Sequence, residues 1–226
     1  MTDARERAAA RPLRRDAELN RRRILSAAAE VFTSRGLQAS LDDVARHAGV
    51  GVGTVYRRFP DKESLVEALF EERIEAIVAL AEKALAEPDS WAGLVSFLAN
   101  ACEQLATDRG LREIIMFATY GRDRVERGKA RMQPLVTRLV QRAQQDGKLR
   151  ADIQPTDVLF IEFMITSAAG YAEHVKPEIW QRYLALITDA LRPAREGTTP
   201  LPVDALRPDE MLVVMRSLSQ QPPSRP

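Results

Sequence analysis

Apolar residues recur at helical spacing along most of this chain, and no alternating runs of β-branched residues stand out. In the segment between Ser40 and Gly49 they stand at i, i+3, i+4 and i+7, which is one buried face of a short helix. Longer segments of this kind are separated by glycine, proline or aspartate. They predict helices at about 16–34, 62–86, 90–107, 111–119, 124–146, 155–173 and 177–192. The expected fold class is all-α.

The residues around the short helix carry the signals of a helix-turn-helix. Ser40 with Asp43 three residues later is a capping box in its acidic form, and Gly49 is a helix-ending residue that tolerates positive φ. Gly51 is the expected cap of a second helix, which runs to about Phe59. A proline and an aspartate then end that helix and cap a long third one. This order predicts a motif whose second helix enters a DNA major groove.

The second helix carries the groups that would contact DNA. Gly53 lets the backbone approach a phosphate, and Val52 and Arg57 are the residues expected to contact bases. Tyr56 is expected to bind phosphate, together with Lys62 in the first turn of the next helix. The full set of expected DNA-binding residues is Ser40, Arg46, Gly51, Val52, Gly53, Thr54, Tyr56, Arg57, Arg58 and Lys62.

The charge distribution agrees with DNA binding at one end of the chain. Residues 1–60 carry 12 arginines against 7 acidic residues, whereas the rest carries 21 basic and 25 acidic residues, so the net charge of +1 hides a basic N-terminal part. Residues 1–15 hold five of these arginines and are expected to form a disordered basic arm. That arm would lie along DNA, or it would be a solvated tail without a specific role.

The motif resembles the DNA-binding domain of the TetR family of bacterial transcription regulators. The resemblance rests on Asp-Val-Ala-x-x-Ala-Gly-Val at residues 43–50 and on Gly-Thr-Val-Tyr-x-x-Phe-x-x-Lys-Glu-x-Leu at residues 53–65. It covers roughly residues 17–76, about a quarter of the chain. Gly51 departs from the pattern, because the family often has serine there. The resemblance implies a C-terminal body that binds a small molecule and forms a homodimer.

The expected division of the chain follows from these signals. A helix-turn-helix domain spans residues 16–62, and a helical body for ligand binding and dimerisation spans residues 63–194. A proline-rich tail follows at residues 195–226, with one short helix at about 209–218. The apolar side of that helix would bury on its own body or on a partner subunit.

Two sets of residues in the body are candidates for these roles. Aromatic and methionine side chains suit an apolar ligand pocket, although the same residues at helical spacing also suit a plain core. The pocket candidates are Trp91, Phe97, Met116, Phe117, Tyr120, Phe163, Met164 and Tyr171. The last two body helices suit a four-helix dimer interface, or they complete a monomeric core. The interface candidates are Phe160, Ser167, Ala168, Ile179, Tyr183 and Ile187.

Composition narrows the function. No apolar stretch approaches the ~20 residues needed to span a membrane, and the first residues carry arginines rather than a signal sequence, so a cytoplasmic protein is expected. One cysteine, Cys102, and no cluster of ligands predict no metal and no cofactor. The expected function is a homodimeric repressor that a small-molecule effector releases from a palindromic operator in double-stranded DNA. The alternatives are an architectural DNA-binding protein without ligand control and, less expected, an enzyme with an accessory DNA-binding motif.

Overall fold

The computed structural model describes residues 2–117, 122–172, 175–193, 201–210 and 213, and within these ranges the chain is helical and holds no strand. The predicted all-α fold class is confirmed. The elements are α1 (Thr2–Arg35), the short 3-10 helix η1 (Gly36–Gln38), α2 (Leu41–Ala48), α3 (Val52–Arg58), α4 (Lys62–Ala86), α5 (Ser90–Thr107), α6 (Arg109–Phe117), α7 (Arg122–Gln145), α8 (Pro155–Ala172) and α9 (Ile179–Ala190).

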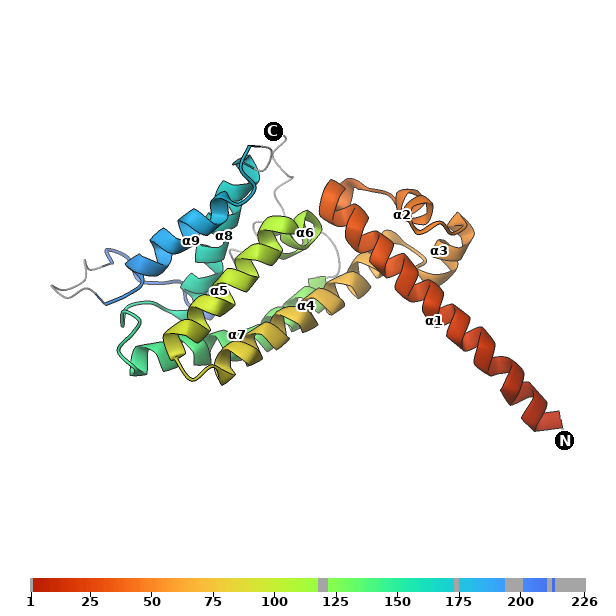
Figure 1. Ribbon diagram of the computed structural model, residues 1–226, viewed down its shortest axis with the longest axis horizontal. Helices are drawn as coiled ribbons and strands as arrows, with labels where there is room; N and C mark the ends of the chain where they lie inside the picture. The colour runs from red at the N-terminus through yellow and green to blue at the C-terminus, as the bar shows by residue number, and fades with distance from the viewer. Residues whose placement is uncertain (1, 118–121, 173–174, 194–200, 211–212, 214–226) are drawn as a thin grey trace.

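The helices form a small N-terminal domain and a larger body, which α4 connects (Figure 1). At its start α4 packs against α1, and along the rest of its length it packs against α5 and α7. Leu65 and Val66, near the start of α4, are almost fully buried, as are Ile77 and Ala81 further along. One long helix therefore contributes buried residues to both the N-terminal domain and the body.

The N-terminus differs from the expected disordered arm, because α1 begins at Thr2 rather than near residue 16. The arginines of residues 1–15 suggested solvated coil, but alanine, arginine and glutamate are also strong helix formers. The helix continues from the apolar stripe of residues 24–32 back to Thr2, although Pro12 lies within it and proline disfavours a helix interior. Figure 1 shows the N-terminal part of α1 projecting away from the rest of the molecule.

In the body, α5 and α8 begin where predicted, whereas α6, α7 and α9 each begin two residues away from the predicted start. Asp89 caps α5, because its Oδ1 accepts hydrogen bonds from the N–H groups of Trp91 at 2.8 Å and Ala92 at 3.0 Å. Ser90 instead donates to Asp146 Oδ2 at 2.5 Å and ties α5 to the end of α7. Likewise α6 begins at 109 rather than 111, where Asp108 Oδ1 accepts from the N–H of Leu111 at 3.0 Å.

Candidate nucleic-acid interface

The turn between α2 and α3 is fixed by the predicted caps. Ser40 Oγ accepts from the N–H of Asp43 at 3.1 Å, and Asp43 Oδ2 accepts in return from the N–H of Ser40 at 3.0 Å, which completes the capping box. The hydrogen bonds from Ser40 hold the pKa of the Asp43 carboxyl below its usual range. Gly49 ends α2 with φ at 62°, in the left-handed region. These contacts set the angle at which α3 leaves the turn.

One face of α3 is anchored and the other is open. Val55 is fully buried and Phe59, just after the helix, is 4% exposed, so the two fix α3 on the domain core. On the opposite face Val52 is 42% exposed and Tyr56 is 46% exposed. Gly53 also lies there, and a Cβ added to it would meet no atom within 4 Å. This face is therefore free to approach a DNA groove.

The remaining predicted DNA-binding residues lie either on α3 or on and just before α2. Arg57 and Arg58 are exposed at the end of α3, and Thr54 is half-buried near its start. Arg46 is 76% exposed and lies 3.4 Å from Asp43 Oδ1, an exposed ion pair of little strength that a phosphate could replace. Ser40 is exposed, but its hydroxyl is used in the capping box. These predicted residues therefore lie on or beside α2 and α3, which pack against each other.

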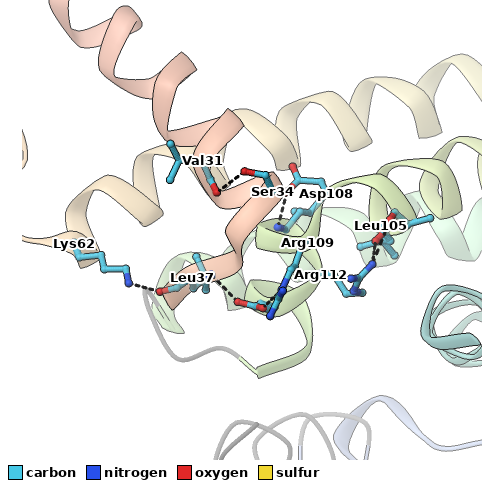
Figure 2. A network of polar contacts seen from close by, with 11 residues as sticks. Val31, Ser34, Leu37, Lys62, Leu105, Asp108, Arg109 and Arg112 are labelled. Atoms are coloured by element: carbon cyan, nitrogen blue, oxygen red, sulfur yellow. Dashed lines mark hydrogen bonds and ion pairs between the residues drawn. The ribbon is translucent and has the colours of Figure 1, made fainter. Parts of the chain in front are cut away.

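Lys62 is the exception. Its ammonium donates to the carbonyl oxygen of Leu37 and lies 5.9 Å from the centroid of the Phe32 ring, so it is directed back onto its own domain (Figure 2). Burial lowers the pKa of Lys62, and the charge of Glu113 partly offsets that effect. A phosphate contact by Lys62 stays a prediction, and it would require the side chain to leave these partners.

The N-terminal domain also contacts α6 directly, a junction that the sequence did not reveal. Glu113 Oε2 accepts from the N–H of Leu37 at 2.7 Å, and Glu113 Oε1 accepts from Arg109 Nε at 2.8 Å. Gly36, with φ at 68°, allows this approach, because a Cβ there would lie 2.5 Å from Glu113 Oε1. Gly110 on α6 likewise allows α6 to approach α1 closely, because a Cβ at this position would lie 2.9 Å from Phe32 Cβ.

A cleft of about 570 Å³ opens beside this junction, between α1, α4 and α5. It is lined by Thr33, Glu72, Arg73, Ala76, Gln104, Thr107 and Asp108. Arg73 Nη2 pairs with Asp108 Oδ2 at 2.8 Å across it. Of the predicted pocket residues whose side chains the structure describes, none lines this cleft.

The predicted pocket residues separate in the structure. Trp91, Phe97 and Phe163 are buried in the body, as either a pocket or a plain core would require. Met164 is 58% exposed, so it does not line an internal pocket; its position in α8 places it on the outer face. Of the other candidates, Tyr120 and the side chains of Met116, Phe117 and Tyr171 lie outside the described residues.

Five of the six predicted interface residues occupy half-buried or exposed positions of α8 and α9. On α8, Phe160 and Ser167 are half-buried and lie on the same face as Met164, at i, i+4 and i+7. On α9, Ile179 and Ile187 are half-buried, Tyr183 is 39% exposed and Leu186, which the prediction missed, is 55% exposed. Helical spacing from Tyr183 could have revealed Leu186. The side chain of Ala168 lies outside the described residues.

Comparison with known proteins identifies the architecture. The family profile for bacterial regulatory proteins of the tetR family matches residues 24–69, and the profile for the SbtR-like transcriptional regulator C-terminal domain matches residues 88–193. A TetR regulatory protein from Mycobacterium vanbaalenii is 31% identical, with a TM-score of 0.58 over 80% of this chain and 99% of that one. The chain belongs to the TetR family. It is thus a transcriptional regulator with a helix-turn-helix DNA-binding domain, as the motif predicted.

Further relatives of this TetR-family regulator agree. A TetR transcriptional regulator from Streptomyces coelicolor is 30% identical, with a TM-score of 0.59 over 77% of this chain and 99% of that one. An HTH-type transcriptional regulator of Staphylococcus aureus is 34% identical over 84 residues, which are 36% of this chain and 44% of that protein. The chain therefore spans less than half the length of such curated relatives. FadR from Bacillus subtilis, solved in complex with stearoyl-CoA, shares the fold at 18% identity and a TM-score of 0.58, covering 74% of this chain and 96% of that one.

Among the residues that the structure describes, no helix is long and apolar enough to cross a membrane. Within the same ranges, no group of three or more histidine, cysteine or acidic side chains is placed to hold a metal ion.

Proposed function

We propose that this TetR-family regulator is a homodimeric repressor that binds a palindromic operator and is released by a small-molecule effector. The observation that carries the DNA-binding part is the open face of α3, where Val52, Gly53 and Tyr56 are exposed beside Arg57. The Arg57 guanidinium can donate two hydrogen bonds to the O6 and N7 of a guanine, whereas the Tyr56 hydroxyl suits a phosphate. Such a regulator acts where the chromosome lies, in the bacterial cytoplasm.

The dimer is supported by the apolar stripe, which we define as Phe160, Met164 and Ser167 on α8 with Ile179, Tyr183 and Leu186 on α9. These two helices pack against each other, which supports the proposal that their exposed faces form one surface. A patch of this kind marks an interaction site more often than a plain exterior. Two copies related by a two-fold axis would bury it as a four-helix interface. The two α3 helices would then have to stand about 34–36 Å apart to enter successive major grooves.

Control by an effector is supported by the shared helix and the junction. A ligand in the body that displaces α4 or α6 would change the position of the N-terminal domain, because Glu113 bonds the Leu37 N–H directly. The ligand must bind the DNA-competent and the released arrangement with different affinity, since otherwise no shift follows. The FadR neighbour shows that this fold can hold a small molecule. We assign the chain no enzymatic activity, and turnover of a bound compound would contradict that assignment.

The DNA part is tested by fluorescence anisotropy on duplexes that tile the DNA upstream of the protein's own gene, against a scrambled duplex at the same salt concentration. Selective binding to an imperfect palindrome is expected. Weak and equal binding to all duplexes would favour an architectural protein without sequence preference.

The dimer is tested by measuring the mass of the protein in solution. Met164→Glu places a charge on the apolar stripe and should convert the dimer to a monomer. Leu19→Glu is the matched control, because Leu19 on α1 is 56% exposed and Met164 is 58% exposed, but Leu19 lies outside the stripe. A dimer that survives Met164→Glu unchanged would show that another surface joins the subunits.

A further inference from the structure

Glu162 is an acidic residue in the buried layer of the body. It lies on α8 at the centre of the buried face, between Val158 and Ile165 in the helical register, and it is 7% exposed. Its Oε1 is buried and has no hydrogen-bond partner among the residues that the structure describes. Polar groups buried in this way are normally hydrogen-bonded, so this oxygen calls for an explanation.

The surroundings of Glu162 offer little compensation. On the neighbouring helix α5, Cys102 is fully buried, and the charge of Glu162 adds to burial in raising the pKa of that thiol to about 12. Burial raises the pKa of Glu162 itself to about 8. A buried carboxyl without a paired cation is destabilising when ionised, and an apolar residue of similar size is usually more stable there. The position therefore suits a partner that the described residues do not supply.

We propose that Glu162 is the polar anchor of the effector site, between α5 and α8, and that the ligand is an apolar compound carrying one ammonium group. A charge-assisted hydrogen bond from the ammonium would satisfy Oε1, and the apolar surroundings would strengthen the attraction between the two charges. An anionic ligand is disfavoured, because its charge would lie beside the carboxylate in the same medium. The inference rests on the proposed function only in treating the bound compound as an effector.

The choice of an ammonium over a neutral donor has a measurable consequence. Free Glu162 is mostly protonated at neutral pH, since burial raises its pKa to about 8. An ammonium binds the carboxylate form, so the carboxyl must give its proton to solvent as the ligand enters. A hydroxyl could bind the protonated carboxyl without any such release. Binding of an amine at pH 7 should therefore release close to one proton per ligand.

The test uses the full-length protein without DNA, and three probes with the same alkyl chain: octylamine, octanol and octanoate. Calorimetric titration in two buffers of different ionisation enthalpy gives both the affinity and the number of protons released. We expect octylamine to bind at least tenfold more tightly than octanol and octanoate, with release of about one proton. Glu162→Gln should lower octylamine affinity at least tenfold and abolish the proton release. The matched control is Glu103→Gln, an exposed carboxyl on α5, which should change neither.

Several outcomes would overturn the proposal. The proposal fails if octylamine does not bind, if Glu162→Gln binds octylamine as tightly as the wild type, or if binding releases no proton. Proton release is measured on the wild type, so the test stays decisive even if Glu162→Gln folds poorly. Octanol binding as tightly as octylamine would overturn the ammonium class. Operator affinity is measured separately: octylamine that binds through Glu162 but leaves DNA affinity unchanged would uphold the site and contradict effector control. Selective operator binding without any octylamine binding would support the proposed DNA-binding function and contradict the role of Glu162 as the ligand's polar anchor.

Discussion

Replacing Gly51 by serine tests the way in which α3 begins. Gly51 is the N-cap of this helix, and no side chain accepts a hydrogen bond from the first turn. Its φ of −64° and ψ of 141° are open to any residue, and an added Cβ would meet nothing closer than Thr54 Oγ1 at 3.9 Å. Serine therefore fits without strain, and its hydroxyl can accept from a free N–H of the first turn.

The size of the effect follows from two contributions. A serine cap in place of glycine adds a few tenths of a kcal/mol, and removing a glycine from the unfolded chain adds about 0.4–1 kcal/mol. The free energy of unfolding should rise by roughly 0.5–1.5 kcal/mol in Gly51→Ser. For a chain of this size each kcal/mol raises the melting temperature by about 2–4 °C.

The matched control is the same substitution two residues earlier. Gly49 has φ at 62°, and an added Cβ would lie 3.0 Å from Arg23 Nη2. A left-handed conformation costs a residue with a side chain about 1–2 kcal/mol, so Gly49→Ser should lower the free energy of unfolding. Urea unfolding and thermal melting of both variants measure the two changes. Shifts of the same sign, or a loss of stability in Gly51→Ser, would refute the assigned cap and turn.

Three further predictions concern DNA reading, the junction and the buried carboxyl. Arg57→Ala should cost about 1–3 kcal/mol of operator affinity and relax the preference at one base position. Tyr56→Ala should lower the affinity for all DNA sequences alike. The reverse pattern in binding-site profiles would exchange the roles of the two residues. Glu113→Gln should lower the free energy of unfolding by about 1–2 kcal/mol, because the hydrogen bond to the Leu37 N–H loses its charge, and an unchanged urea midpoint would contradict this. Glu162 keeps its proton up to about pH 8 in the folded protein but only to about 4.5 when unfolded, so stability should fall as pH rises through this window. Glu162→Gln should flatten that dependence in urea titrations, and an equally steep decline would contradict the burial of the carboxyl.

The parts of the site that the sequence predicted are those that neighbouring residues determine. The capping box of Ser40 and Asp43 and the left-handed Gly49 involve groups within a few residues of one another, so the order of residue types was sufficient. The anchoring of Val55 and the exposure of Tyr56 follow from helical period alone. The extended α1 was missed, because arginine supports both a solvated arm and a helix.

The remaining features depend on contacts between distant segments. Glu113 and Leu37 are 76 positions apart, and nothing local to either residue indicates their hydrogen bond. Met164 was assigned to a pocket because residue type does not tell an inner apolar face from an outer one on a helix that is apolar nearly all round. Glu162 did carry a signal, since it is the one acidic residue in the run from 158 to 172, and that isolation could have marked it as unusual.

The most direct test of the central claim is selection of binding sites from a library of random duplexes by the full-length protein, with Arg57→Ala selected in parallel. The wild type should enrich a two-fold symmetric site whose half-sites lie about one helical turn or a multiple of it apart. Arg57→Ala should recover the same site with one pair of symmetry-related positions relaxed. Failure to enrich any symmetric site, or identical profiles from the two proteins, would contradict a dimeric regulator that reads its operator through α3.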